Sequence, residues 1–166
     1  MLILALSCVA ALLALAALAV ALGSAARASP IVYAACLAAC LILLTGAFAR
    51  LVATPGEIAR LVLPIGLPGL GAHFRLDALA AFFLAVTNLG GAAASLYALG
   101  YGRHESAPQR VLPFFAAYLA GMNLVVLADD AFTFLLTWEF MSLASWALVV
   151  AHHDEPAMPA PATSIS

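Results

Sequence analysis

The chain has 166 residues, of which 66% are hydrophobic and only 8% are charged. Soluble domains are nearer half apolar and a quarter charged, so this composition excludes an ordinary soluble fold and predicts an integral membrane protein. The formal net charge of -2 is too small to indicate a nucleic-acid partner, and all six basic residues are arginine.

Two apolar runs come first along the chain, at residues 2–23 and 31–52, and each is long enough to cross a bilayer as a helix. The first run has no basic segment before it and is longer than the apolar part of a signal peptide, so we interpret it as a transmembrane helix. In the second run, Cys36 and Cys40 lie one helical turn apart and share a face. A metal-binding pair is one interpretation, but small apolar filler is favoured, because no histidine or acid lies near them in the sequence.

Residues 53–77 interrupt the apolar pattern with three prolines, four glycines and four charged side chains. We expect an extramembrane loop that contains a short β-hairpin, with arms at residues 60–64 and 72–76. Asp77 immediately precedes the next apolar run. We therefore expect it to cap the N-terminus of a helix, with a direct functional role as the alternative.

Three further apolar runs follow, at residues 78–101, 111–128 and 131–151. Only a tight turn separates the last two, and its acids, Asp129 and Asp130, mark the water interface. The sequence therefore predicts an all-α fold, a polytopic bundle of five transmembrane helices, followed by a Pro-rich disordered tail at residues 152–166. The arginines are divided three and three between the two sides, so the positive-inside rule leaves the orientation open.

Glu139 is an acid in the middle of the fifth apolar run, within the sequence LLTWEFMSLASW. At ~1.5 Å per residue it lies on the order of 12 Å from the interface marked by Asp130, near the midplane of a bilayer. An ionised acid there costs roughly 2.5–3.5 kcal/mol, so such a residue is a functional candidate that faces a bundle interior or water. The alternative is a carboxyl group that hydrogen bonds to a neighbouring helix and only packs.

Further polar side chains are candidates to accompany Glu139 on a proton path. Ser142 follows it by three residues on the same helical face. Asn88 lies in the third run, and Tyr118 and Asn123 lie in the fourth. Such groups also commonly tie membrane helices together, and both interpretations stay open here. The sequence contains no phosphate-binding loop, nucleophile motif or haem signature, so we expect no catalytic residue, no bound cofactor and no metal.

Two segments carry a family resemblance: FRLDALAAFFLAVTNLGGAAASLYALGYGRHE at residues 74–105 and YLAGMNLVVLADDAFTFLLTWEFMSLASWALVV at residues 118–150. Over about residues 70–151 the chain resembles the antiporter-like membrane subunits of complex I and the group 4 hydrogenases. The WE pair followed by MSL is the most specific feature. Within that family the chain is most similar to the B subunits of hydrogenase-4 and formate hydrogenlyase, of which it matches only the N-terminal part.

The resemblance implies a function and an orientation. In this family the glutamate of the fifth helix, which Glu139 matches, pairs with a lysine two helices later and forms part of a proton half-channel driven by distant redox chemistry. The resemblance also implies a multi-pass protein of the bacterial inner membrane, with its N-terminus outside and its C-terminal tail cytoplasmic. Its partners would be the other membrane and peripheral subunits of the complex, and the chain alone would not be a catalyst.

The chain departs from this family because it has fewer predicted helices and no lysine, so it carries only one half of that ion pair. We therefore interpret it as a truncated or split membrane subunit of a proton-translocating hydrogenase or a complex related to NADH:quinone oxidoreductase. Two alternatives stay open. One is a small membrane scaffold in which Glu139 only packs, and the other is part of a cation/proton antiporter.

Overall fold

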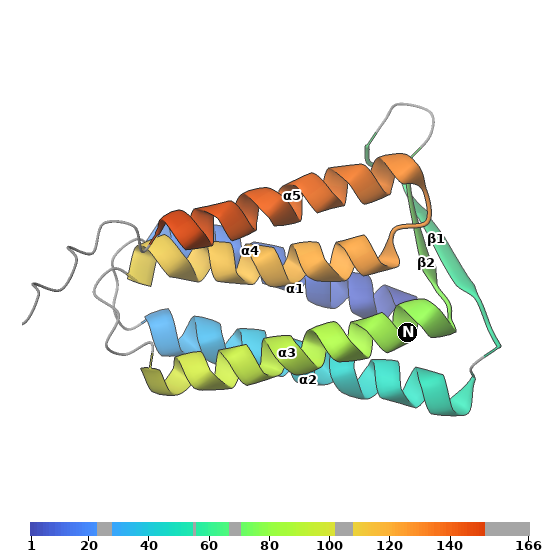
Figure 1. The fold of residues 1–166 in the computed structure, drawn as a ribbon, viewed down its shortest axis with the longest axis horizontal. Coiled ribbons are helices and arrows are strands. Elements are labelled where there is room, and N and C mark those ends of the chain that lie inside the picture. The colour runs from blue at the N-terminus through green and yellow to red at the C-terminus, as the bar shows by residue number, and fades with distance from the viewer. Residues whose placement is uncertain (23–27, 55, 67–70, 102–107, 152–166) are drawn as a thin grey trace, which may run out of the picture.

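The computed structural model describes residues 1–22, 28–54, 56–66, 71–101 and 108–151. They form five helices and two strands, in the order α1 (Leu2–Leu22), α2 (Ala28–Ala53), β1 (Ala59–Leu63), β2 (Ala72–Leu76), α3 (Ala78–Tyr101), α4 (Pro108–Leu127) and α5 (Ala131–Val150). The predicted all-α class is confirmed, with a small sheet as a minor addition. In Figure 1 the helices lie side by side and the hairpin of β1 and β2 lies across one end of the bundle. The tail at residues 152–166, which we expected to be disordered, lies outside the described residues.

Four of these helices, α1, α2, α3 and α5, are long and apolar enough to cross a membrane. Helix α4 has a shorter apolar stretch, Val111–Leu127, and it lies at the centre of the bundle, where α1, α3 and α5 pack against it. Large apolar side chains such as Leu18, Val52 and Leu143 are exposed on the outside of the bundle. Such a surface suits hydrocarbon rather than water, and the chain is therefore a helical membrane protein.

Small side chains fill the contacts between the first four helices. The larger of the two core clusters includes Ala16 of α1, Cys36 and Cys40 of α2, Ala92 of α3 and Ala116 of α4. Because lipid tails are as apolar as leucine, membrane helices associate through close packing of this kind. Both cysteines are fully buried within the cluster, which agrees with their interpretation as apolar filler.

The predicted hairpin is confirmed, with β1 one residue earlier than expected, and its strands pair antiparallel. Ala72, Phe74 and Leu76 of β2 are buried and alternate with less buried residues, which is the pattern of a strand with one covered face. At the start of β2, Gly71 has a φ of 71°, and an added Cβ there would lie 2.8 Å from the carbonyl oxygen of Leu63. Only glycine fits this position.

Asp77 caps α3, as the sequence predicts. Its Oδ1 accepts a hydrogen bond of 2.8 Å from the backbone N–H of Ala80, which satisfies one of the free donors at the start of the helix. Its other oxygen, Oδ2, lies 3.4 Å from Nη1 of Arg75, at the end of β2. The cap thus also ties the hairpin to the start of α3.

Helix α5 is held almost entirely by α4. Thr133, Thr137 and Ala144 are its buried residues. Gly121 of α4 approaches Met141 so closely that an added Cβ would lie 3.0 Å from the Cα and 3.0 Å from the Cβ of Met141. Because this contact involves the backbone of both helices, a change of side-chain rotamer cannot relieve the steric overlap that an added Cβ would cause.

Gly121→Ala is therefore expected to destabilise the folded bundle by about 1–3 kcal/mol, because α5 must move away from α4. The unfolding transition of the helices in mixed detergent micelles, followed by circular dichroism, measures this loss. Gly90→Ala is the matched control, since nothing lies within 4 Å of the added Cβ, and alanine favours a helix by ~1 kcal/mol over glycine. Equal losses in the two variants would contradict the close contact.

Candidate functional site

Glu139 projects from the side of α5 that faces away from α4. It is separated by two residues, about 200° around the helix, from Thr137, which is buried in the contact with α4. The side chain is exposed. Within the described part of the chain it makes no hydrogen bond and no ion pair, so it does not pack there as polar glue between helices.

The surface around Glu139 is apolar apart from one hydroxyl group. Leu135, Leu143 and Trp146 share this side of α5 and are 60%, 62% and 65% exposed. Ser142, one turn further along, is half-buried. We define these four residues and Glu139 as the open face of α5. It places a single carboxylate in the middle of an apolar helix surface.

Asn88 and Asn123, two other predicted path residues, meet in the centre of the bundle. Nδ2 of Asn88 donates a hydrogen bond of 2.7 Å to Oδ1 of Asn123, which joins α3 to α4. Each amide also donates to the carbonyl four residues earlier in its own helix, at 2.8 Å. Both side chains are buried, with 1% and 0% of their surface exposed. This arrangement ties the two helices together.

Tyr118 lies beside this pair, on an open groove between α3 and α4. The groove has a volume of about 330 Å³, and Thr87 and Gly91 of α3 and Tyr118 and Met122 of α4 contribute to its walls. Tyr118 is half-buried. The groove and the asparagine pair are therefore formed by the same two helices.

The predicted path residues form two separate groups at one depth. Met141 lies opposite Gly121, and α4 and α5 run antiparallel (Figure 1). Glu139, two residues before Met141, is thus about level with Asn123, two residues after Gly121. Each lies about 200° around its helix from the contact, so the two side chains point in opposite directions. The structure brings Asn88 and Asn123 together, places Tyr118 on the groove between the same two helices, and separates all three from Glu139 and Ser142.

The turn between α4 and α5 fixes the start of the helix that carries Glu139. Oδ1 of Asp130 accepts a hydrogen bond of 2.9 Å from the backbone N–H of Thr133, and its Oδ2 accepts from the Thr133 hydroxyl. The hairpin takes part as well. The backbone N–H of His73 donates to Oδ2 of Asp130 at 3.2 Å, and the carbonyl of His73 accepts from the N–H of Asp129 at 2.9 Å. The turn is therefore bonded to β2 as a further, very short strand.

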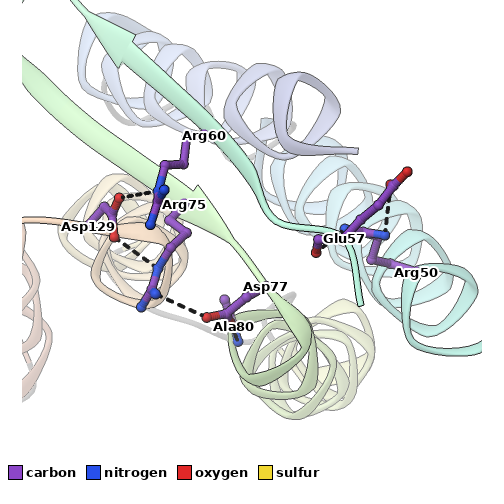
Figure 2. A network of polar contacts seen from close by, with 7 residues as sticks. All are labelled: Arg50, Glu57, Arg60, Arg75, Asp77, Ala80 and Asp129. Atoms are coloured by element: carbon purple, nitrogen blue, oxygen red, sulfur yellow. Dashed lines mark hydrogen bonds and ion pairs between the residues drawn. The ribbon is translucent and has the colours of Figure 1, made fainter. Parts of the chain in front are cut away.

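Asp129 forms ion pairs with two arginines that face each other across the hairpin. Arg60 and Arg75 are directly paired in the register of β1 and β2, an arrangement of like charges that destabilises a sheet. Nε of Arg60 lies 3.2 Å from Oδ2 of Asp129, and Nε of Arg75 lies 2.9 Å from Oδ1. Figure 2 shows the carboxylate between the two guanidinium groups. The sequence predicts Asp129 and Asp130 only as markers of the interface. The positions of Arg60 and Arg75, each on one arm of the expected hairpin, are the signal that points to a shared acid.

Comparison with known proteins indicates a partial relationship. No family model matches the chain. Over 93 residues, the chain is 42% identical to uncharacterized proteins from two strains of Mycobacterium tuberculosis, a match that covers 54% of the chain and 14% of each relative. Over 83 residues it is 39% identical to "Hydrogenase-4 component B" of Escherichia coli, which covers 49% of the chain and 12% of that protein. The chain thus spans about one seventh of the length of the curated relatives it matches. The last match supports the distant relationship predicted from the sequence.

Asp129→Asn is expected to loosen the hairpin, because Arg60 loses its acid and Arg75 keeps only its pair with Asp77 while the two guanidinium groups still face each other. The partly exposed ion pairs are worth about 1 kcal/mol, so hydrogen–deuterium exchange at the amides of β1 and β2 should accelerate about fivefold. Glu57→Gln is the control. It removes the charge of an exposed acid that pairs with Arg50 at 3.3 Å, away from the turn (Figure 2). Unchanged hairpin exchange in Asp129→Asn would show that the three charges do not hold the hairpin.

The pH dependence of the turn follows from Asp130. The Thr133 hydroxyl, followed by the Thr133 backbone N–H, lowers the pKa of this carboxyl group, and the His73 backbone and side chain lower it further. The folded pKa lies below the unfolded pKa, so the stabilisation is present above about pH 4 and is lost as the pH falls through the folded pKa.

Thr133→Val removes the hydroxyl donor and keeps the backbone N–H, so we expect it to raise the pKa of Asp130 toward its ordinary value. Carbon-13 NMR titration of the carboxyl group measures this shift directly. Thr137→Val serves as control, because the Thr137 hydroxyl bonds to the carbonyl of Thr133 and not to the acid. A pKa of Asp130 that is the same in Thr133→Val and in the unmodified chain would exclude the hydroxyl as the main cause.

Proposed function

We propose that the chain is part of a membrane subunit of a proton-translocating, hydrogenase-like complex, and that Glu139 is the midplane carboxylate of a proton half-channel in that subunit. The partial match to hydrogenase-4 component B supports the type of assembly. The redox chemistry belongs to other subunits in this proposal, and the chain contributes to the path of the proton.

The observation that carries the proposal is the direction of Glu139. Its carboxyl group is exposed on the open face of α5, opposite the helix that holds α5 in place. An ionised acid facing hydrocarbon at this depth costs roughly 2.5–3.5 kcal/mol or more, so a stable assembly must cover it with a polar group or with water. The open face is therefore where a further membrane segment is required.

In this proposal, the further membrane segment that covers the open face of α5 supplies a positive charge. The family resemblance implies a lysine partner for the fifth-helix glutamate, and this chain contains no lysine. All six arginines lie near helix ends or in connections by the predicted span limits. The cation that pairs with Glu139 therefore comes from a segment outside these residues, docked on the surface formed by Leu135, Leu143 and Trp146.

A carboxylate with a movable cation can pass a proton on. In this proposal the cation pairs with the carboxylate of Glu139, and displacement of the cation accompanies transfer of the proton. Ser142, which follows Glu139 on the same face, is placed to bond to either form or to hold a water molecule. Redox-driven displacement of the cation is the event that couples the complex to the proton path in this proposal.

The proposal includes an orientation for the chain. The N-terminus lies at the same end of the bundle as the hairpin (Figure 1), and Leu2 packs in one cluster with Phe74 of β2. With the N-terminus outside the bacterial inner membrane, as the resemblance implies, the hairpin and the turn at Asp129 also lie outside. The C-terminal end of α5 and the tail then lie in the cytoplasm.

The decisive experiment compares Glu139→Gln with the unmodified chain in the assembled complex, in inverted membrane vesicles. We expect redox-driven proton uptake to fall by at least about tenfold, while the amount of assembled complex stays the same. Glu57→Gln, which removes a charge from the exposed loop, should leave proton uptake unchanged. Unimpaired proton uptake in Glu139→Gln would refute the role of Glu139, and failure of the chain to copurify with any redox subunit would refute the assembly.

A further inference from the structure

The asparagine pair between α3 and α4 has one hydrogen-bond acceptor left over. Nδ2 of Asn88 uses both of its N–H groups, one on the carbonyl of Leu84 and one on Oδ1 of Asn123. Oδ1 of Asn88 is buried and has no hydrogen-bond partner among the described residues. Asn123 donates one N–H to the carbonyl of Leu119. An amide group carries two such hydrogens, so one of them is available.

Flipping the side-chain amides of Asn88 and Asn123, so that oxygen and nitrogen exchange places, does not pair all of their donors and acceptors. If the oxygen and nitrogen of Asn88 exchanged places, its oxygen would face the carbonyl oxygen of Leu84, which also only accepts. The same holds for Asn123 and the carbonyl of Leu119. Both amide orientations are therefore fixed by the carbonyls four residues earlier, and only one direct bond between the two side chains is possible.

A buried acceptor without a donor is destabilising, and bulk solvent does not reach this one, because Asn88 is 1% exposed. Ser95 lies seven residues further along α3, on the same side of the helix, and its buried hydroxyl also has no partner among the described residues. Both buried side-chain atoms without a hydrogen-bond partner among the described residues therefore lie on one face of α3.

We propose that Oδ1 of Asn88 binds a water molecule inside the bundle, and that this water also accepts the available N–H of Asn123. The pair then becomes a three-membered polar centre in which the water bridges the two amides. The groove between α3 and α4, with Thr87 and Gly91 in one wall and Leu119 and Met122 in the other, is not lined by the two asparagines, so the proposed water is enclosed in the bundle. These residues flank Asn88 and Asn123 directly in the sequence or lie one turn away.

Water fits the centre better than a cation does. A sodium or calcium ion requires several oxygen ligands at once, and here the described residues offer one free amide oxygen. A water molecule needs only two to four polar partners in a small polar site. The inference is independent of the proposed function, since it rests on the amide pair and not on Glu139.

The test uses the full chain in detergent micelles, labelled with nitrogen-15 at the asparagine side chains. The chain has two asparagines, so the spectrum contains two side-chain amides. We expect the side-chain amides of both asparagines to show rotating-frame Overhauser cross-peaks at the water frequency, with the sign of a bound water molecule. In Asn88→Leu, which removes the acceptor, the cross-peak of the Asn123 amide should be lost.

Thr137→Val is the control, because Thr137 lies on α5 and its hydroxyl bonds to carbonyls of its own helix; both cross-peaks should persist. Absence of a water cross-peak at Asn88 in the unmodified chain would overturn the proposal. A cross-peak at Asn123 that survives in Asn88→Leu would overturn it as well, by assigning the water to Asn123 alone. If Asn88→Leu does not fold, the spectrum of the unmodified chain decides.

Discussion

The hydrogen bonds between the backbone of His73 and the turn at Asp129 and Asp130 determine how the outermost helix is held. Among the described helices, α5 has only α4 as a close neighbour. Two constraints therefore fix its rotation: the close contact of Gly121 with Met141 and the anchored N-terminus of α5. With both in place, the buried and open faces of α5 are defined. The outward direction of Glu139 is a consequence of these two attachments, made by residues that never touch it.

The sequence predicts the helices, the hairpin and the helix cap of this fold much better than the contacts that join these elements to one another. Long apolar runs predict the helices, the Pro- and Gly-rich loop predicts the hairpin, and the position of Asp77 before an apolar run predicts a cap. The role of Asp129 was not predictable in the same way, because its partner Arg60 lies 69 residues earlier in the chain. Hydrophobic periodicity indicates neither which acid serves which arginine nor which face of the uniformly apolar α5 turns outward.

The two polar groups in the middle of the bundle differ in chemistry, and this difference explains their different places. An amide carries donors and acceptors, so Asn88 and Asn123 can bond to each other and be buried between two helices. An ionised carboxylate only accepts, so Glu139 needs donors, and within the described structure it receives no hydrogen bond. The bilayer favours burial of the first kind of group inside one chain. It favours the second kind at a junction between membrane segments, where a donor can approach and leave.

The short apolar stretch of α4 has a consequence for how the protein is made. Val111–Leu127 spans roughly 26 Å at ~1.5 Å per residue, less than the ~30 Å hydrocarbon layer. In the finished bundle this mismatch is shielded, because α1, α3 and α5 surround α4. During synthesis α4 leaves the ribosome before α5, and only the three earlier helices that contact it, α1, α2 and α3, are available to shield it. The mismatch therefore favours coupling of membrane insertion to tertiary packing, because α4 is shielded only when the earlier helices lie beside it.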